Sequence, residues 1–480
     1  MRPNYGDDME FSEYRACDAI ALAELIRDKE VSAEEVCKTA IDRAIAVNPQ
    51  INAIVHERFE KALAESSKLP NGPLKGVPYL IKDLAFYQEN EPATLGSRLF
   101  ADYIPDHDSA YTAMCKAAGL NIIGRSNSPE LGLSGNTEPV LHGACANPWN
   151  PNHSAGGSSG GAASAVAAGI LPVAHATDGG GSIRIPAAQC GLFGLKPTRG
   201  RVSFAPDAGE GWGGLSIGHV VSRSVRDSAL MLDLTGQTVA GDPYTAPPNV
   251  RPFLDELHEP PKRLRIALMR KTHRGTDFHT DNLEAIENAA KLCEDLGHEV
   301  VEDSPEIDLA TLRRSSGLVS QANICRVLER RWEALGREPN ENDVERATWY
   351  TYERGKSITA RQYLDGLAAV HESGRQFAAF MSNYDVILSA TVSAPPPPLG
   401  HLDMNGDPAT FIERTNEVIA VTPLHNATGT PAMSVPLHWN ADGLPIGVHF
   451  AGRFGEENTL LKLAAQLESA APWFDRVPRL

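Results

Sequence analysis

The middle of the chain reads Gly156-Gly157-Ser158-Ser159-Gly160-Gly161 and, after an apolar, alanine-rich segment, Thr177-Asp178-Gly179-Gly180-Gly181-Ser182-Ile183-Arg184. A flexible linker is also rich in glycine and serine, but it has no reason to lead into an apolar segment and a second such cluster. Glycine adopts backbone angles that other residues cannot, so the two clusters can bring main-chain amides and hydroxyls into one small volume. That combination favours a site that binds developing negative charge.

A lysine at the end of an apolar stretch is the second notable feature. Residues 77–81, Val-Pro-Tyr-Leu-Ile, predict a short buried strand, and Lys82 follows directly. On the residues alone two interpretations remain open. The side chain can extend to solvent, as lysines beside apolar segments often do. Alternatively it stays buried, where the low dielectric lowers its pKa and makes the neutral amine available as a base.

Capping residues predict two helices near the N-terminus. Asp18 is placed to cap a first helix that runs to about Arg27. Ser32 and Glu35 form a capping box for a second helix, which Asn48-Pro49 is expected to end.

Three later segments add to the predicted organisation. Residues 264–302 read as strand, helix and strand, which implies a parallel strand pair. Residues 308–380 are charged and helical, and we expect them to form a lid or an entrance wall. The four prolines at 395–398 predict a stiff loop, expected over the mouth of a pocket.

The glycine-serine motifs together with Lys82 resemble the amidase signature family of serine hydrolases. The matching segments are Gly156–Gly161, Asp178–Arg184, Pro186–Ala188, Cys190-Gly191 and Gly194–Thr198. The resemblance implies an α/β fold, with a large mixed twisted sheet sandwiched between helical layers. It also implies a single amidase domain over residues 1–480, with a signature core at about 74–228, a variable helical lid at about 308–380 and a closing sheet and helix at 385–468.

The resemblance further implies which residues carry the chemistry. Ser182 corresponds to the nucleophile, Ser158 to a bridging serine joined to Gly157 by a cis peptide, and Lys82 to the base; the two serines lie 24 positions apart, as in the family. Amides of the second cluster would form the oxyanion hole, and three further residues would support the site. The oxyanion set is Gly179, Gly180, Gly181 and Ser182, and the supporting set is Ser159, Asp178 and Arg184. No cofactor is implied.

These residue types suit acyl transfer for physical reasons. A serine hydroxyl is a weak nucleophile until a base takes its proton, and a lysine serves as that base only when neutral. Lys82 does not need to touch Ser182, because the hydroxyl of Ser158 can donate one hydrogen bond while it accepts another. Asp178 and Arg184 are expected to brace the loop rather than to react.

Other interpretations of the same residues remain. Gly156–Gly160 also matches the Gly-x-Ser-x-Gly nucleophile elbow, in which Ser158 attacks and His425 or His449 completes a triad. That motif needs a buried strand before the serine, and His153-Ser154-Ala155 is not strand-like.

Two further functions for this chain, and Cys190 as an alternative nucleophile, are disfavoured. A phosphate-binding loop lacks its Gly-Lys-Ser/Thr ending. An amidotransferase-like subunit of a larger complex would fit the motifs, but the triad positions are all present and the acidic charge suits tRNA poorly. Cys190 lies in an apolar setting and is expected in the core rather than as a nucleophile.

Composition limits the partners and the compartment. A net charge of −17 disfavours nucleic acid. Seven cysteines without a Cys-x-x-Cys pair indicate a reduced compartment and no structural zinc site. Residues 1–15 lack a signal-peptide core, and the longest apolar run, residues 162–174, is too short to span a bilayer. We therefore expect a cytoplasmic protein without a membrane partner; members of the family that it resembles are often homodimers.

The substrate is harder to predict than the reaction. Pro172–Asp178 and Asn342–Glu345 look most similar to the hydrolases of cyclic nylon oligomers, and relatives of that type also cleave aryl amides and carbamates. We expect a small or medium, mostly apolar amide, anilide or carbamate, with esters as side substrates and a primary amide as the alternative. Gln321 and Asn323 are candidate pocket residues in the lid, or simply solvated residues of a helix.

Overall fold

A mixed eight-stranded sheet forms the centre of the molecule, which we describe from a computed structural model for residues 9–419 and 421–480. The strand order is β10-β9-β11-β13-β12-β7-β8-β6. The strands are β6 (Val173–Asp178), β7 (Phe193–Lys196), β8 (Ile217–Ser222), β9 (Arg265–Leu268), β10 (Glu299–Glu302), β11 (Val386–Ala390), β12 (Ala432–Trp439) and β13 (Pro445–Gly452). Strands β9, β10 and β11 pair in parallel, which confirms the predicted strand-helix-strand unit, whereas the remaining pairs are antiparallel.

Helices cover both faces of this sheet. On β13, a Cβ at Gly447 would lie 2.4 Å from Ala188 Cβ of α7 (Arg184–Cys190). On the opposite face of the same strand, a Cβ at Gly452 would lie 3.3 Å from Leu460 Cγ of α16 (Glu457–Ala470). The helices that contact the sheet are α6 (Gly160–Ala167), α7 (Arg184–Cys190), α8 (Val225–Thr235), α10 (Thr280–Asp295) and α16 (Glu457–Ala470). The expected α/β sandwich is therefore confirmed.

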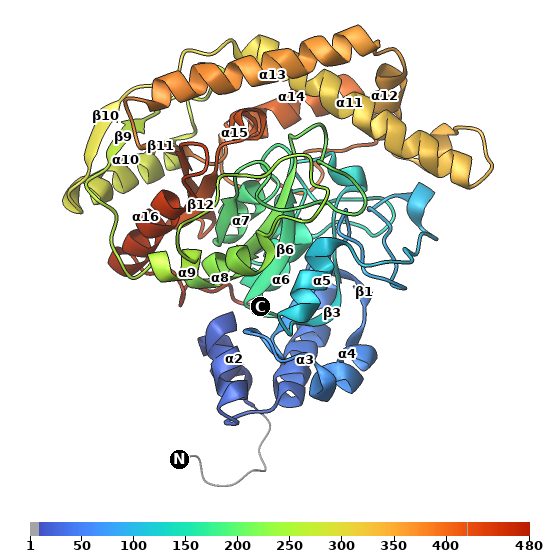
Figure 1. Cartoon of the computed structure of the whole chain (residues 1–480), viewed down its shortest axis with the longest axis vertical. Helices are drawn as coiled ribbons and strands as arrows, with labels where there is room; N and C mark the ends of the chain where they lie inside the picture. The colour runs from blue at the N-terminus through green and yellow to red at the C-terminus, as the bar shows by residue number, and fades with distance from the viewer. Residues whose placement is uncertain (1–8, 420) are drawn as a thin grey trace.

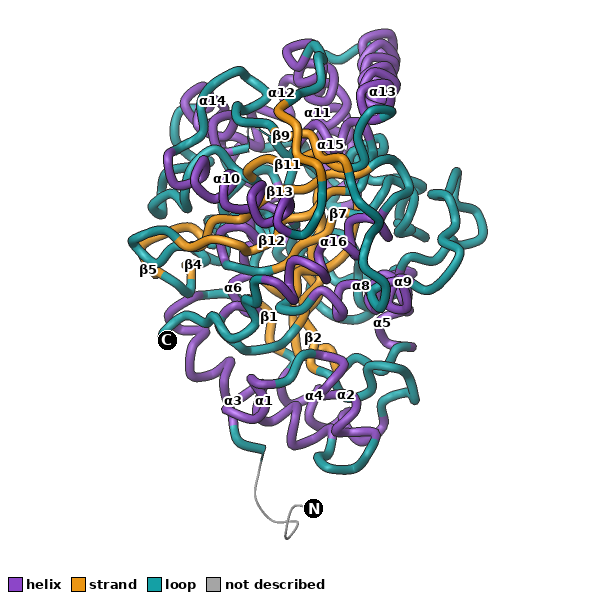
Figure 2. Tube along the Cα trace, turned by 90° about the vertical axis from the view of Figure 1, so that its left-hand side faces the viewer, coloured by secondary structure: helices purple, strands orange, loops and turns teal. Residues whose placement is uncertain are grey.

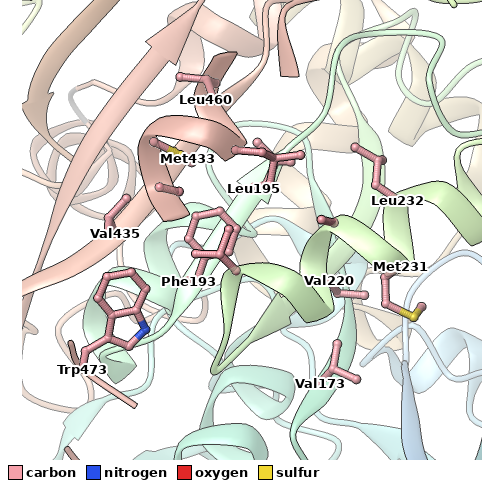
Figure 3. Close-up of a cluster of buried hydrophobic side chains, with 14 of the residues drawn as sticks. Val173, Phe193, Leu195, Val220, Met231, Leu232, Met433, Val435, Leu460 and Trp473 are labelled. Atoms are coloured by element: carbon pink, nitrogen blue, oxygen red, sulfur yellow. The ribbon is translucent and has the colours of Figure 1, made fainter. Parts of the chain in front are cut away.

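The main core lies between the central sheet and the helices α8 and α16 (Figure 3). Large apolar side chains from the sheet and these helices are buried there. They include Val173, Phe193, Leu195, Val220, Met231, Leu232, Met433, Val435, Leu460 and Trp473. Because successive strand residues alternate between faces, the same strands present their other side chains to α6 and α7.

A second, smaller sheet carries the lysine. Its order is β1-β3-β2, with β1 (Ile54–Glu57), β2 (Pro78–Lys82) and β3 (Asn121–Ser126). Strands β2 and β3 are parallel and completely buried. Lys82 is the last residue of β2, as the apolar pattern predicted.

Two helical groups lie at opposite ends of the molecule (Figures 1 and 2). At one end are α1 (Phe11–Ala16), α2 (Ala19–Arg27), α3 (Ala33–Ile51) and α4 (Phe59–Glu65). At the other end are α11 (Leu309–Ala334), α12 (Arg346–Lys356) and α13 (Ala360–Met381), which form the helical region predicted at about 308–380. The remaining elements are α5 (Ala110–Ala117), α9 (Phe253–Glu256), α14 (Pro408–Val418), α15 (Pro423–Thr428), four 3-10 turns and the β4 (Ala146–Asn147) and β5 (Asn150–Ser154) hairpin.

The N-terminal helices confirm the predicted caps and correct one boundary. Asp18 accepts from the Ala21 amide, and Ser32 and Glu35 form the capping box. However, α3 continues through Pro49 to Ile51, because a proline in the last turn removes only one amide donor and Ile51 is fully buried.

The short helix α1 has no periodic apolar pattern in its sequence and was not predicted. The expectation about a signal peptide concerns residues 1–8 in part, and these lie outside the described residues.

The proline-rich segment does not lie where it was expected. The backbone of Pro397 accepts from the Ser154 amide, and Pro398 forms a bridge with His153, so the segment pairs with β5. None of the four prolines lines either cavity that reaches Ser182 in the described structure. The segment is therefore held by backbone pairing, which its sequence does not predict.

No helix formed by residues 9–419 and 421–480 combines the length and the apolar character needed to cross a bilayer. All seven cysteines are free, as their spacing predicted.

Candidate active site

Lys82 is buried at the junction of the two glycine-serine clusters. Its Nζ atom lies 2.7 Å from Ser158 Oγ, 2.9 Å from Ser159 Oγ and 2.9 Å from Thr177 Oγ1. The residue is 0% exposed. The interpretation in which the side chain reaches solvent is thus wrong, and the predicted contact with Ser159 is confirmed.

The surroundings of Lys82 favour the neutral amine. Burial lowers its pKa well below the ordinary value for lysine, and the negative charge of Asp178 only partly opposes this shift. All three hydrogen-bond partners are uncharged hydroxyls. A neutral amine surrounded by hydroxyls can accept a proton from one of them.

The backbone around Ser158 passes so close to other segments that only glycine fits at positions 157 and 161. The Gly157–Ser158 peptide is cis, as the resemblance implied. A Cβ at Gly157 would lie 2.4 Å from the Asn136 carbonyl oxygen, and one at Gly161 would lie 2.3 Å from the Asn127 nitrogen. These close approaches explain why the first cluster is rich in glycine. They bring the start of α6 against the β3 region and turn Ser158 toward Lys82.

Ser182 lies in the loop between β6 and α7. The carboxylate of Asp178 shapes this loop: it accepts from the Gly181 amide at 2.7 Å and from the Ile183 amide at 3.2 Å. Arg184 holds the same carboxylate through contacts of 2.9 and 3.0 Å. Burial raises the pKa of Asp178, but the charge and hydrogen bonds of Arg184 outweigh it and leave that pKa well below its usual range. The predicted bracing role matches this geometry.

The same contacts contradict the prediction that the Gly181 amide is an oxyanion donor. The Gly181 amide is occupied by Asp178, so it is not available to a substrate oxygen. Within the described structure the amides of Gly179, Gly180 and Ser182 donate to no acceptor. At Gly180 a Cβ would meet nothing within 4 Å, so this amide belongs to an open part of the loop.

The Ser182 hydroxyl faces open space together with Ser158. Both serines line one cavity of about 410 Å³, and Ser182 also lines a second cavity of about 630 Å³. Among the described residues no protein group is hydrogen-bonded to the Ser182 hydroxyl. The Ser182 hydroxyl is therefore accessible to a small molecule in these cavities, whereas the Lys82 amine is not exposed.

The nucleophile-elbow alternative does not match the geometry. The partner of Ser158 is Lys82, while His449 Nε2 lies 3.1 Å from an Arg184 nitrogen and His425 Nδ1 lies 3.2 Å from Thr430 Oγ1. The prediction that the residues before Ser158 are not strand-like was wrong for residues 153–154, which belong to strand β5. That strand forms a small separate hairpin created by the Asn-Pro turn and is not part of the central sheet.

Three residues beside the predicted site residues were not predicted from the sequence. Thr177 supplies the third hydroxyl around Lys82, and its position beside Asp178 at the end of a strand was the available signal. Asn426 donates to Asp178 Oδ1 at 2.8 Å from 248 positions away, and no sequence pattern marks it. Trp212 lines both cavities.

Of the two residues predicted as pocket candidates in the helical region, Asn323 lines the smaller cavity and Gln321 lines neither. Cys190 is buried in the core, where burial raises its pKa.

One group of possible metal ligands lies outside these cavities. Among the described residues, His56, Asp83 and His142 have ligand atoms within 4.8 Å of one another. Thr94 donates to Asp83 and lies 2.8 Å from His142 Nε2, so a hydroxyl already connects two members of the group. The three side chains do not reach the space around Ser182.

Comparison with known proteins agrees with this arrangement. The profile of the family described as Amidase matches residues 35–461. The 6-aminohexanoate-cyclic-dimer hydrolase of Paenarthrobacter ureafaciens is 38% identical over 482 residues, covering 96% of this chain and 96% of that protein. A solved 6-aminohexanoate cyclic dimer hydrolase complexed with substrate superposes with a TM-score of 0.93 at 36% identity, over 97% of this chain and 99% of that chain. A bacterial aryl acylamidase of the amidase signature family superposes with a TM-score of 0.86 at 27% identity, over 95% and 96% of the two chains. The chain therefore belongs to the amidase signature family and is a hydrolase of amide bonds.

Proposed function

We propose that this hydrolase cleaves a small or medium, mostly apolar amide or carbamate through an acyl-enzyme formed on Ser182, with Lys82 as the base acting through Ser158. The observation that carries the proposal is the 2.7 Å contact between the buried Lys82 amine and Ser158 Oγ, in a cavity that Ser158 shares with Ser182. A neutral amine held out of water is a competent base at neutral pH.

The proposed steps follow from the contacts. Ser182 Oγ attacks the carbonyl carbon and gives its proton to Ser158, which passes its own proton to Lys82 Nζ. The free amides of Gly179, Gly180 and Ser182 stabilise the oxyanion of the tetrahedral intermediate. The carbon-nitrogen bond then breaks, and the proton returns from Lys82 through Ser158 to the leaving amine. Water then attacks the carbonyl carbon of the acyl-enzyme and gives a proton through Ser158 to Lys82. As the bond between that carbon and Ser182 Oγ breaks, the proton returns through Ser158 to Ser182 and the acid is released.

The substrate class rests on the lining of the cavities and on the relatives. Apolar side chains dominate, and the two cavities have the size of pockets for small molecules. The matched relatives include a hydrolase of a cyclic amide dimer and an aryl acylamidase. Secondary amides, anilides and carbamates are the substrates that these features support, with esters as side substrates.

A panel assay tests the proposal. A nitroanilide, an aryl carbamate, a cyclic diamide and a free primary amide would be compared with the same enzyme and with Ser182→Ala. We expect turnover of at least one of the first three, a poor rate with the primary amide, and no turnover by Ser182→Ala. Preference for the primary amide would contradict the substrate class, and full activity of Ser182→Ala would contradict the mechanism.

A further inference from the structure

Two cavities meet at the nucleophile. The larger, of about 630 Å³, and the smaller, of about 410 Å³, share only four of their lining residues: Gly132, Gly179, Ser182 and Trp212. Two of these are glycines and one is the nucleophile. The indole of Trp212 is therefore the one large side chain at the junction of the two described cavities.

The linings of the two cavities differ in chemistry. The smaller cavity collects aromatic side chains besides Trp212: Phe86, Tyr87, Phe100, Tyr103 and Phe204. Aliphatic side chains line both cavities, but the described lining of the larger one has no aromatic ring besides Trp212 and His273. Its aliphatic side chains include Ile185, Leu215, Leu312, Ile419 and Val421. Aromatic walls favour a flat ring through stacked or edge-on contacts, whereas aliphatic walls favour an alkyl chain.

Helix α11 runs along both cavities. Its first half, up to Ser320, lines the larger cavity, and its second half, from Asn323 onward, lines the smaller one. Ser316 and Val327 lie eleven positions apart, which is about three helical turns and so the same face of the helix. Substitutions at these two half-buried positions therefore form a matched pair, one for each cavity.

The position of Trp212 is set by a tight turn. The Ser216 amide donates to the Gly211 carbonyl at 3.0 Å and closes this turn, and Trp212 has a φ of 49°. A Cβ at Gly213 would lie 2.6 Å from Val319 Cγ1, so α11 packs directly on the turn. On its other side the indole reaches the nucleophile loop, since a Cβ at Gly179 would lie 2.9 Å from Trp212 Cζ3. The side chain thus fills the space between the lid and the loop.

We propose that Trp212 divides the substrate site into two subsites, with the smaller cavity binding an aromatic leaving amine and the larger cavity binding an aliphatic acyl group. The assignment rests on the proposed function and on Ser158, which lines the smaller cavity but not the larger one. Ser158 delivers the proton to the leaving nitrogen, so that nitrogen and its substituent lie on the Ser158 side. The carbonyl carbon bonds to Ser182 Oγ, the carbon-nitrogen bond breaks, and the acyl group remains on the side away from Ser158.

Deacylation kinetics separate the two subsites. Amides that share an acyl group form the same acyl-enzyme, so a change confined to the amine subsite alters acylation but not the hydrolysis of that acyl-enzyme. With hexanoyl p-nitroanilide, Val327→Trp should lower the acylation rate about tenfold or more and leave the deacylation rate unchanged. Ser316→Trp should change both rates. The reverse pattern, or equal effects of the two variants on both steps, would overturn the assignment.

A pair of isomeric amides tests the chemical preference and the role of Trp212. N-benzylhexanamide and N-pentyl-2-phenylacetamide have the same atoms and the same apolar groups, with the amide reversed. We expect kcat/KM to favour N-benzylhexanamide by about tenfold or more. Trp212→Ala should reduce that preference, and Trp212→Phe should retain most of it. A preference for the other isomer, or an unchanged ratio in Trp212→Ala, would overturn the proposal.

Failure of this inference is distinguishable from failure of the proposed function. If both isomers are hydrolysed through an acylated Ser182 but without the expected preference, the subsites are assigned wrongly while the reaction stands. If no acyl-enzyme forms on Ser182 with any amide, the proposed function itself fails. The two α11 variants keep the assignment testable even where Trp212→Ala does not fold.

Discussion

The Nζ atom of Lys82 lies 2.7 Å from the Oγ atom of Ser158, at a position that solvent does not reach. This contact joins the end of a strand in the small sheet to the loop that precedes α6. In the proposed mechanism, activity depends on the protonation state of this one amine.

Activity should rise with pH, because the proposed mechanism needs Lys82 as a neutral amine. Burial lowers the pKa of Lys82 well below the ordinary value, so the neutral fraction increases as pH passes through that lowered pKa. A profile of kcat/KM against pH should show one ascending limb below the range of an ordinary lysine. Lys82→Ala should lose roughly 100-fold to 10,000-fold in rate, and its residual rate should rise with hydroxide concentration.

A second buried lysine provides the control for this assignment. Burial lowers the pKa of Lys196 to about 7, but its Nζ donates to the Pro197 carbonyl oxygen and forms no hydrogen bond to a serine of the described residues. Lys196→Met should therefore keep the ascending limb at the same pH. If a limb that levels off at higher pH disappears in Lys196→Met and persists in Lys82→Ala, the base has been misidentified.

The hydroxyls of Ser159 and Thr177 should position the amine. Each lies 2.9 Å from Lys82 Nζ, and removing one leaves the amine less firmly directed at Ser158. Thr177→Val should lower kcat by about tenfold to a hundredfold with little change in KM, while Thr177→Ser should retain most activity. Equal rates for Thr177→Val and the unaltered enzyme would show that this hydroxyl does not position the base.

The amide of Gly180 should act as an oxyanion donor. Gly180→Pro removes the amide hydrogen, and loss of one such donor costs about 100-fold to 1,000-fold in kcat. Gly180→Ala keeps the amide, and its Cβ meets no atom within 4 Å, so this variant should remain active. Steady-state kinetics of both variants check the prediction. A loss in Gly180→Ala as large as in Gly180→Pro would point to steric blockage instead.

The buried pair of Asp178 and Arg184 should matter for stability. Both side chains are 0% exposed, so Arg184→Met leaves an unpaired buried carboxylate. We expect the free energy of unfolding to fall by about 3–5 kcal/mol, measured by denaturant titration. Because the pKa of Asp178 is lowered in the folded state, the contribution of the pair is present above the carboxyl's unfolded pKa and is lost as pH falls through the folded pKa.

An exposed pair serves as the control for that experiment. Arg361 and Asp365 lie 3.6 Å apart on the solvent side of α13, with 90% and 72% of their side chains exposed. Arg361→Met should leave stability almost unchanged, because water screens such pairs. Comparable losses in the two variants would indicate a general effect of removing arginine.

Local sequence rules predicted the parts of the site that depend on local structure. The apolar run before Lys82 correctly gave a buried strand, and the glycine clusters correctly gave close backbone approach. The spacing of Ser158 and Ser182, read through the family resemblance, placed both serines in one cavity. Capping residues located α2 and α3 for the same reason, since a cap is a contact between near neighbours in the chain.

What the sequence could not supply depends on distant contacts. Asn426 reaches Asp178 across 248 positions, and the Gly181 amide is taken by a carboxylate whose direction only the folded loop determines. The proline segment at 395–398 pairs with β5 through its backbone, which carries no residue-specific pattern. Trp212 lies between two cavities because a turn and helix α11 meet there. The helical region was predicted, but its contact with this turn from a distant part of the chain was not.

Trapping the acyl-enzyme tests the central claim most directly. The protein would be incubated with a slowly deacylating aryl carbamate, and the adduct would be measured by intact-mass spectrometry and mapped by peptide sequencing. The relay from Lys82 through Ser158 predicts a mass increase of one carbamoyl group located on Ser182, absent in Ser182→Ala and formed far more slowly in Lys82→Ala. An adduct on Ser158, or rapid adduct formation on Ser182 in Lys82→Ala, would contradict the account.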